Sequence, residues 1–163
     1  MAYRRIVVAT DGSDSAETAE TIASTLASID GAKLTIAHAY ANPDRANEAV
    51  VRAEEIADRE GALHELALSA DAPADAILMT ADEKDAELIV IGSIGFSTSD
   101  QLFGSVSRRV VTHAPCDVLL TRARTIGEHE KPAPPYRRIL IATDGSSTAD
   151  RAAPHVRAAD HVV

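Results

Sequence analysis

The chain has 163 residues, 45% of them hydrophobic, which is about the length of one domain with enough apolar side chains for a core. Its 16 basic and 25 acidic residues give a formal net charge of -9, which repels nucleic-acid backbones and anionic lipids and excludes both as expected partners. A single cysteine, Cys116, excludes an intrachain disulfide framework, and the lack of a signal-peptide pattern or a membrane-length apolar run predicts a cytoplasmic protein.

Short apolar runs alternate with helical periodicity along the first part of the chain. Residues 6–9 form an apolar run that ends in Asp11-Gly12-Ser13, which predicts a buried strand entering a turn. Apolar residues then recur at helical spacing over residues 16–29, with Ser13 or Ser15 as the cap and Gly31 as the stop. The next predicted elements are a strand over residues 34–39 and a helix over residues 46–61.

The alternation continues to residue 121. It predicts a strand over residues 63–69, a helix with Pro73 in its first turn, and a strand over residues 88–91. A helix over residues 105–113 and a strand over residues 118–121 complete the pattern. Strands that alternate with helices predict an α/β fold of three layers, with a five-stranded, mainly parallel open sheet.

An internal repeat follows a segment rich in proline and charge. Residues 136–146 (YRRILIATDGS) repeat residues 3–13 (YRRIVVATDGS) with two conservative differences, and a helical pattern comes next. We therefore predict one domain over residues 1–122, a linker over residues 123–135 and a partial second repeat over residues 136–163. A strand and a helix alone cannot bury their own core, so this copy either begins a truncated second domain or docks on another surface.

Two segments follow strands, at the sheet edge where open α/β folds bind ligands. In the first, the Asp11 carboxylate contacts a polar ligand such as a ribose, or the segment is an ordinary Asp-Gly turn that caps a helix. In the second, Gly92 and Gly95 are followed after eight residues by Gly104 and Ser105 at a helix start. Glycines and a helix N-terminus can cradle a phosphate; the alternative is that the glycines serve turn geometry only.

Taken in order, the stretches VVATDGS, IAHA, LIVIGS and GSVSRRVVTHAPCDVLL resemble the universal stress protein family, over residues 3–121 and again from residue 136. The resemblance implies a Rossmann-like fold of the adenine nucleotide alpha hydrolase type. In nucleotide-binding members, a motif G-x-x-G, nine residues, then G-[S/T] contacts the phosphates and ribose of ATP. The spacer in this chain, residues 96–103, has eight residues and is one shorter than that pattern.

The resemblance also implies a residue-by-residue site. It assigns phosphate contacts to Gly92, Gly95, Gly104 and Ser105, adenosine contacts to Asp11 and its neighbours, and an adenine contact to the backbone near Ala39. The remaining predicted nucleotide-binding residues are neighbours in the same two loops: Ala9, Thr10, Gly12, Val106 and Ser107.

The function implied by the resemblance is a stress-response protein that binds ATP, with Mg²⁺ or Mn²⁺, and presents a ligand-dependent surface to an unidentified protein partner. No lysine follows the glycines to neutralise a γ-phosphate, so no catalytic residue is predicted and efficient phosphoryl transfer is disfavoured. Two alternatives remain. One is a dimerising module that acts through protein contacts without a nucleotide, and the other is a slow ATPase.

The last strand of the predicted domain suggests self-association. Residues Val118 to Thr121 carry no charge or proline, so at a sheet edge their free backbone groups would pair with another strand. Family members dimerise through this edge, and a homodimer is expected by resemblance. The other chemically notable residues predict no site: the histidines lack paired metal-ligand spacing, Cys116 is expected to be a small buried residue, and the arginine pairs are expected to have local acidic partners.

Overall fold

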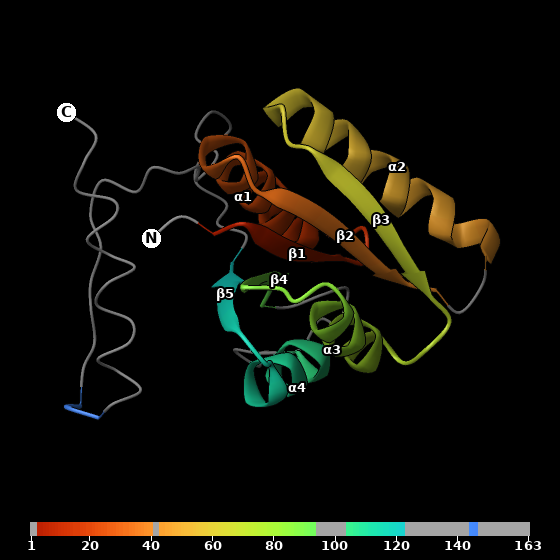
Figure 1. The fold of residues 1–163 in the computed structure, drawn as a ribbon. Helices are drawn as coiled ribbons and strands as arrows, with labels where there is room; N and C mark the ends of the chain where they lie inside the picture. Colours follow the sequence, from red (N-terminus) through yellow and green to blue (C-terminus); the bar gives the residue numbers. More distant parts are fainter. Residues whose placement is uncertain (1–2, 41–42, 94–103, 123–143, 147–163) are drawn as a thin grey trace.

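The computed structural model describes residues 3–40, 43–93, 104–122 and 144–146. Strands and helices alternate along its main part (Figure 1). The first half contains β1 (Arg5–Thr10), α1 (Asp14–Asp30), β2 (Lys33–Ala39), α2 (Pro43–Glu60) and β3 (His64–Ser69). The second half contains α3 (Pro73–Glu83), β4 (Leu88–Gly92), α4 (Ser105–His113) and β5 (Asp117–Thr121). The predicted elements are confirmed, with ends that differ by a few residues.

The five strands form one sheet in the order β3-β2-β1-β4-β5, and every neighbouring pair is parallel. Strand β1 lies in the middle, with β2 on one side and β4 on the other. The chain therefore reverses its direction of travel across the sheet between β1 and β4, and such a switch point leaves a crevice at the carboxyl ends of the strands. Strands β3 and β5 are the two edges.

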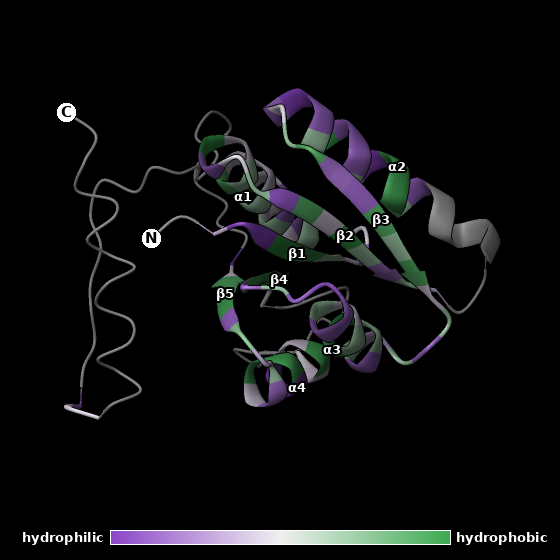
Figure 2. Cartoon of the chain, viewed as in Figure 1, coloured by the Kyte–Doolittle hydropathy of each residue, from purple (hydrophilic) through white to green (hydrophobic). Residues whose placement is uncertain are grey.

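Helices cover both faces of the sheet, which gives the predicted three layers (Figure 1). One hydrophobic cluster packs α1 and α2 against the sheet and contains Ile6, Val8, Ile22, Leu34 and Ala57. A second cluster packs α3 and α4 against the opposite face and contains Val7, Ile77, Ile89, Ile91 and Val110. Figure 2 shows the hydrophobic colour concentrated along β1 and β4, while much of α2 is hydrophilic on its outer side. Burial of both faces is what a parallel sheet requires.

Local signals explain where α1 begins and ends. Ser13 is the N-cap, and its side-chain oxygen accepts a hydrogen bond from the Ala16 N–H at 3.2 Å. Gly31 ends the helix in the left-handed conformation, with φ of 65°. Of the two serines that could cap the helix, Ser13 does so and Ser15 does not. Helix α2 begins at Pro43, one turn before the predicted start at residue 46, because a proline is well tolerated in a first helical turn.

One arginine of each predicted pair among the described residues has a local acidic partner. Arg5 forms an ion pair with Glu87 at 3.2 Å, and Arg109 forms one with Asp75 at 2.5 Å. Cys116 is partly buried and packs against the α3 and α4 cluster, and burial raises the pKa of its thiol to about 11. Within the part of the chain that the structure describes, no helix is long and apolar enough to cross a membrane.

Candidate functional site

A pocket of about 260 Å³ opens at the carboxyl ends of β1 and β4, where the topology predicts a crevice. This volume is close to the lower end of the roughly 300 to 1,000 Å³ that is typical of small-molecule sites. The lining residues come from three strands, three helices and the loops between them: Ala9, Thr10, Asp11, Ser13, Ala16, Ala37, Ala39, Pro73, Ile77, Ile91, Gly92, Gly104, Ser105, Val106 and Ser107.

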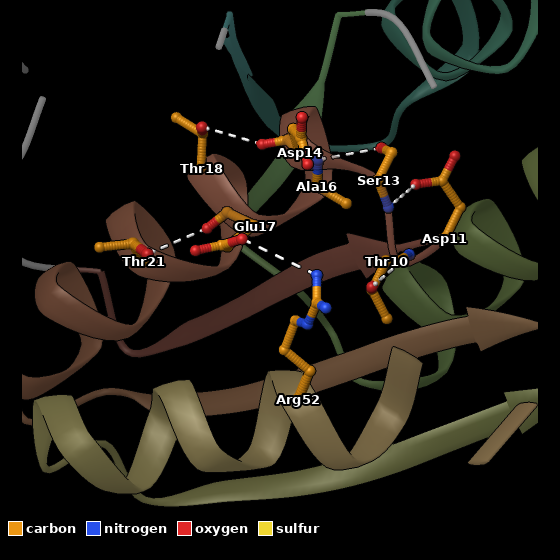
Figure 3. Close-up of polar contacts among 10 residues, drawn as sticks. Thr10, Asp11, Ser13, Asp14, Ala16, Glu17, Thr18, Thr21 and Arg52 are labelled. Atoms are coloured by element: carbon orange, nitrogen blue, oxygen red, sulfur yellow. Dashed lines mark hydrogen bonds and ion pairs between the residues drawn. The ribbon is translucent and has the colours of Figure 1, made fainter. Parts of the chain in front are cut away.

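The turn between β1 and α1 brings a carboxylate to the pocket. The Ser13 N–H donates a hydrogen bond to Asp11 Oδ1 at 3.0 Å, and the Gly12 N–H donates one to Thr10 Oγ1 at 3.2 Å (Figure 3). Gly12 has a φ of 79°, a conformation that favours glycine. Asp11 therefore shapes an Asx turn and also lines the pocket, so the two interpretations of this segment are compatible.

Gly92, the last residue of β4, lies directly against the first turn of α1. A Cβ atom at this position would collide with the Ser15 Oγ atom and would lie 3.0 Å from the Ser15 backbone carbon and oxygen. Any side chain would push α1 away from β4. Gly92 therefore has a packing role in addition to its place on the pocket wall.

Ser93, which follows β4, is hydrogen-bonded to the start of α4 and to the end of β5. Its carbonyl oxygen accepts the Gly104 N–H at 2.8 Å and the Ser107 hydroxyl at 2.9 Å, and its own N–H donates to the Thr121 carbonyl at 2.7 Å. Ser93 and Ser107 are both buried. These bonds fix the start of α4 beside the end of β4, so Gly92 and Gly104 line the same pocket although the spacer between the glycine pairs has only eight residues.

The N-terminus of α4 lies at the pocket. The N-cap is Gly104, and no side chain of the described residues caps the helix, whereas α1 is capped by Ser13. The first N–H groups of a helix have no partner within the helix and carry the positive end of its dipole. Ser105 and Val106, the first two helical residues, line the pocket. This end of the pocket is suited to an anionic group such as a phosphate.

Another part of the pocket lining is apolar. Three alanines at the strand ends, Ala9, Ala37 and Ala39, leave space that larger side chains would fill. Pro73 and Ile77 of α3 and Ile91 of β4 complete this wall, which was not predicted from the sequence. An apolar wall next to an anion-binding end fits a ligand with a flat apolar ring at one end and a phosphate at the other.

Among the described residues, no basic side chain lines the pocket. Lys33 and Lys84 both contact Glu65, at 2.7 Å and 2.9 Å, and hold the pKa of that carboxyl at about 2. Residues 94–103, which have the sequence IGFSTSDQLF, contain no lysine or arginine either. In the described ranges no group of three or more His, Cys, Asp and Glu side chains could hold a metal ion.

A buried glutamate, Glu20, lies near the pocket residue Thr10. Thr10 is buried, and its carbonyl oxygen accepts the His38 Nδ1–H at 2.9 Å. Glu20 of α1 is 2% exposed, and neither of its carboxylate oxygens makes a hydrogen bond with any described residue. Burial raises the pKa of Glu20 to about 7, against the smaller opposing effect of the nearby Thr10 hydroxyl.

Most of the predicted site residues come together in the structure. Nine of them line the pocket: Ala9, Thr10, Asp11, Ala39, Gly92, Gly104, Ser105, Val106 and Ser107. Gly12 does not line it and instead forms the turn that holds Asp11. Gly95 lies outside the described residues. Sequence reasoning missed Ser13, Ala16, Ala37, Pro73, Ile77 and Ile91 as lining residues.

The second copy of the DGS sequence forms the same local turn as the first. The Ser146 N–H donates to Asp144 Oδ1 at 2.9 Å, and Gly145 has a φ of 76°, close to the 79° of Gly12. The rest of the predicted linker and second repeat lies outside the described residues. The turn is thus a property of the local sequence and does not depend on the pocket.

A family model and related sequences both match universal stress proteins. The sequence model of the universal stress protein family matches residues 2–122. The "universal stress protein in QAH/OAS sulfhydrylase 3'region" of Thermus aquaticus is 39% identical over 140 residues, which cover 74% of this chain and 99% of that protein.

Solved structures of universal stress proteins are also similar to this chain. A universal stress protein in complex with cAMP is 38% identical, with a TM-score of 0.65 over 74% of this chain and 97% of its own. A universal stress protein from Archaeoglobus fulgidus in complex with dAMP is 34% identical, with a TM-score of 0.56 over 74% of this chain and 99% of its own.

Proposed function

The chain belongs to the universal stress protein family, and we propose that it binds an adenine nucleotide in the pocket between the ends of β1 and β4. The observation that carries this proposal is the pocket itself, which combines apolar lining residues with a helix N-terminus that no described side chain caps. Adenine would lie against Ala39 and the apolar wall, and phosphate would lie against the N–H groups of Ser105 and Val106. Asp11 would contact the ribose.

The complexes of two related proteins with cAMP and dAMP support the nucleotide class. Within this class we propose ATP as the ligand, following the glycine motif. A divalent ion, Mg²⁺ or Mn²⁺, would reach the site with the ATP phosphates, since the described residues contain no metal-binding cluster.

We further propose that the protein acts by presenting a surface that changes with the ligand, and that it is not a catalyst with rapid turnover. The described residues of the pocket supply no lysine or arginine to stabilise charge on a transferred phosphoryl group. A bound nucleotide would instead change the surface around Asp11 and the start of α4, and a protein partner would recognise that state.

Self-association is a separate part of the proposal. Strand β5 is an edge of the sheet, and one side of its backbone has no neighbouring strand among the described residues. Such an edge pairs readily with another strand. We propose a homodimer formed through β5, and a dimerising module that needs no nucleotide remains the alternative function.

Calorimetric titration of the purified protein with ATP, AMP and cAMP tests the nucleotide proposal. Gly104→Val should abolish binding, because a side chain would occupy the space beside the first helical N–H groups. Asp11→Ala should weaken binding, whereas the control Asp144→Ala changes the same turn in the second copy and should leave affinity unchanged. Wild-type affinity in both pocket variants would refute the site. No binding by the wild type would favour the dimerising module.

A further inference from the structure

Glu20 is a buried carboxyl group that the proposed function has not yet used. Its side chain is 2% exposed and makes no hydrogen bond through either oxygen with the described residues. Ser24, one turn further along α1, is 1% exposed, and its hydroxyl also lacks a partner among them. An ionised carboxylate in such surroundings loses its hydration without compensation, so the neutral form is favoured well above the ordinary pKa of a glutamate.

The position of Glu20 connects it to the pocket through Thr10. Thr10 is the last residue of β1 and lines the pocket, and its hydroxyl lies near the Glu20 carboxyl. The same hydroxyl oxygen accepts the Gly12 N–H, while the Thr10 carbonyl accepts the His38 ring N–H. The Thr10 O–H favours the ionised carboxylate and lowers the pKa of Glu20, an effect smaller than that of burial. The Thr10 oxygen has two lone pairs, so it can also accept a second hydrogen bond from a protonated Glu20.

The charged groups around Glu20 come from each element packed against it. Glu17 on α1 and Asp11 in the turn disfavour its ionised form, and Arg52 on α2 favours it. Arg52 is also 3.8 Å from Glu17, toward which it points in Figure 3. His38 on β2 faces Thr10, and β4 (LIVIG) contributes no titratable group. The net charge of these neighbours is negative, and an anionic ligand in the pocket would add further negative charge near Glu20.

We propose that Glu20 is a positioning residue that links adenine-nucleotide binding to proton uptake, with the neutral carboxyl favouring the occupied pocket. This inference rests on the proposed function. A neutral Glu20 removes one negative charge near the phosphate and can donate its O–H to Thr10, which steadies the turn that holds Asp11. Because binding linkage is reciprocal, a bound nucleotide must make the carboxyl harder to ionise, and affinity must fall as pH rises through neutrality.

The test uses cAMP, whose single phosphodiester does not change its charge near neutral pH. Calorimetry should show binding to the wild type on the order of threefold to tenfold tighter at about pH 6 than at about pH 8. Near pH 7, titrations in two buffers with different heats of ionisation should show uptake of a fraction of a proton. Glu20→Gln keeps the neutral state and should bind equally at both pH values without proton uptake.

Glu17→Gln is the matched control, since Glu17 is a partly exposed glutamate one turn earlier on the same helix. This variant removes a charge that disfavours ionised Glu20, so it should keep a pH dependence of binding, with its midpoint at lower pH than in the wild type. If Glu20→Gln keeps that dependence as well, another group such as His38 is responsible and the proposal is overturned. Equal wild-type affinity at both pH values would overturn the proton linkage while leaving nucleotide binding intact. No cAMP binding at either pH, together with none for ATP and AMP, would instead overturn the proposed function on which this inference rests.

A measurement on the wild type covers the case in which Glu20→Gln does not fold. Carbon-detected NMR of the side-chain carboxyl groups follows the Glu20 titration directly. Saturating cAMP should move its midpoint to higher pH, and an unchanged or lower midpoint would overturn the proposal.

Discussion

The carbonyl oxygen of Ser93 accepts the backbone N–H of Gly104 at 2.8 Å. These two residues flank the ten-residue segment 94–103, so the bond joins the end of β4 to the start of α4. The same carbonyl also accepts the Ser107 hydroxyl. The positions of Gly92 and Gly104 at the pocket are therefore set by local hydrogen bonds, and the spacer that is one residue short of the family pattern does not separate them.

Ser107→Ala tests this junction. The variant removes a buried hydroxyl that donates to Ser93, and we expect the free energy of unfolding to fall by about 1 kcal/mol. Thr112→Ala is the control, because the Thr112 hydroxyl also donates to a backbone carbonyl but is exposed, so its loss should change stability by much less. Urea unfolding measures both. Equal effects of the two variants would show that the Ser93 contact does not hold α4 in place.

Gly92→Ala tests the close approach of β4 to α1. The added Cβ atom would collide with Ser15, and relieving the clash should cost about 1 to 3 kcal/mol of stability and weaken nucleotide binding. The single variant Ser15→Ala removes a buried hydroxyl that lacks a partner among the described residues, so it should leave stability unchanged or raise it. Thermal unfolding of the two variants separates these expectations, and a Gly92→Ala protein as stable as the wild type would contradict the packing role.

Most of the fold could be predicted because each element carries its own signal. The apolar run at residues 6–9 marks β1, Ser13 caps α1, and Gly31 ends it in the only conformation class that strongly favours glycine. The exact strand ends could not be predicted, since pairing with neighbouring strands extends β1 to Arg5 and Thr10. Ile29 follows the helical apolar pattern but is 64% exposed, because it lies in the last turn of α1.

The site was predictable where glycine and aspartate mark it and not where apolar residues line it. Pro73 and Ile77 look like a helix start and a core position, and a residue that borders a cavity has the same pattern as one that fills a core. Glu20 was missed because a charged residue is normally expected at the surface. Its spacing held a signal, since Glu20 is in phase with Ala16 and Ala23, which are both buried.

The proposed homodimer can be tested with the two sheet edges as a matched pair. Leu119→Lys places a charge on β5, and the variant should sediment as a monomer where the wild type sediments as a dimer. Leu68→Lys places the same charge on β3, the opposite edge, where Leu68 is already 51% exposed, and the dimer should persist. Leu119 also packs partly against the α1 and α2 cluster, so circular dichroism must show that the Lys variant is folded. Dissociation by Leu68→Lys instead would place the interface at β3.

The ion pairs of Glu65 predict a pH dependence of stability with a definite sign. Lys33 and Lys84 lower the pKa of this carboxyl to about 2, from 4.5 for an unperturbed glutamate. Because the folded-state pKa is the lower one, the stabilisation is present above about pH 4.5 and is lost as pH falls toward 2. At neutral pH, Glu65→Gln should reduce the free energy of unfolding by about 1 kcal/mol, since the pairs are partly exposed.

The difference in the free energy of unfolding between Glu65→Gln and the wild type should shrink below about pH 4 in urea titrations, and high salt should also reduce it. Glu83→Gln, an exposed glutamate without an ion pair among the described residues, should show no such change. A Glu65→Gln deficit that is constant from neutral pH to about pH 3 would mean that the variant disturbs packing and that the two lysine contacts contribute nothing measurable.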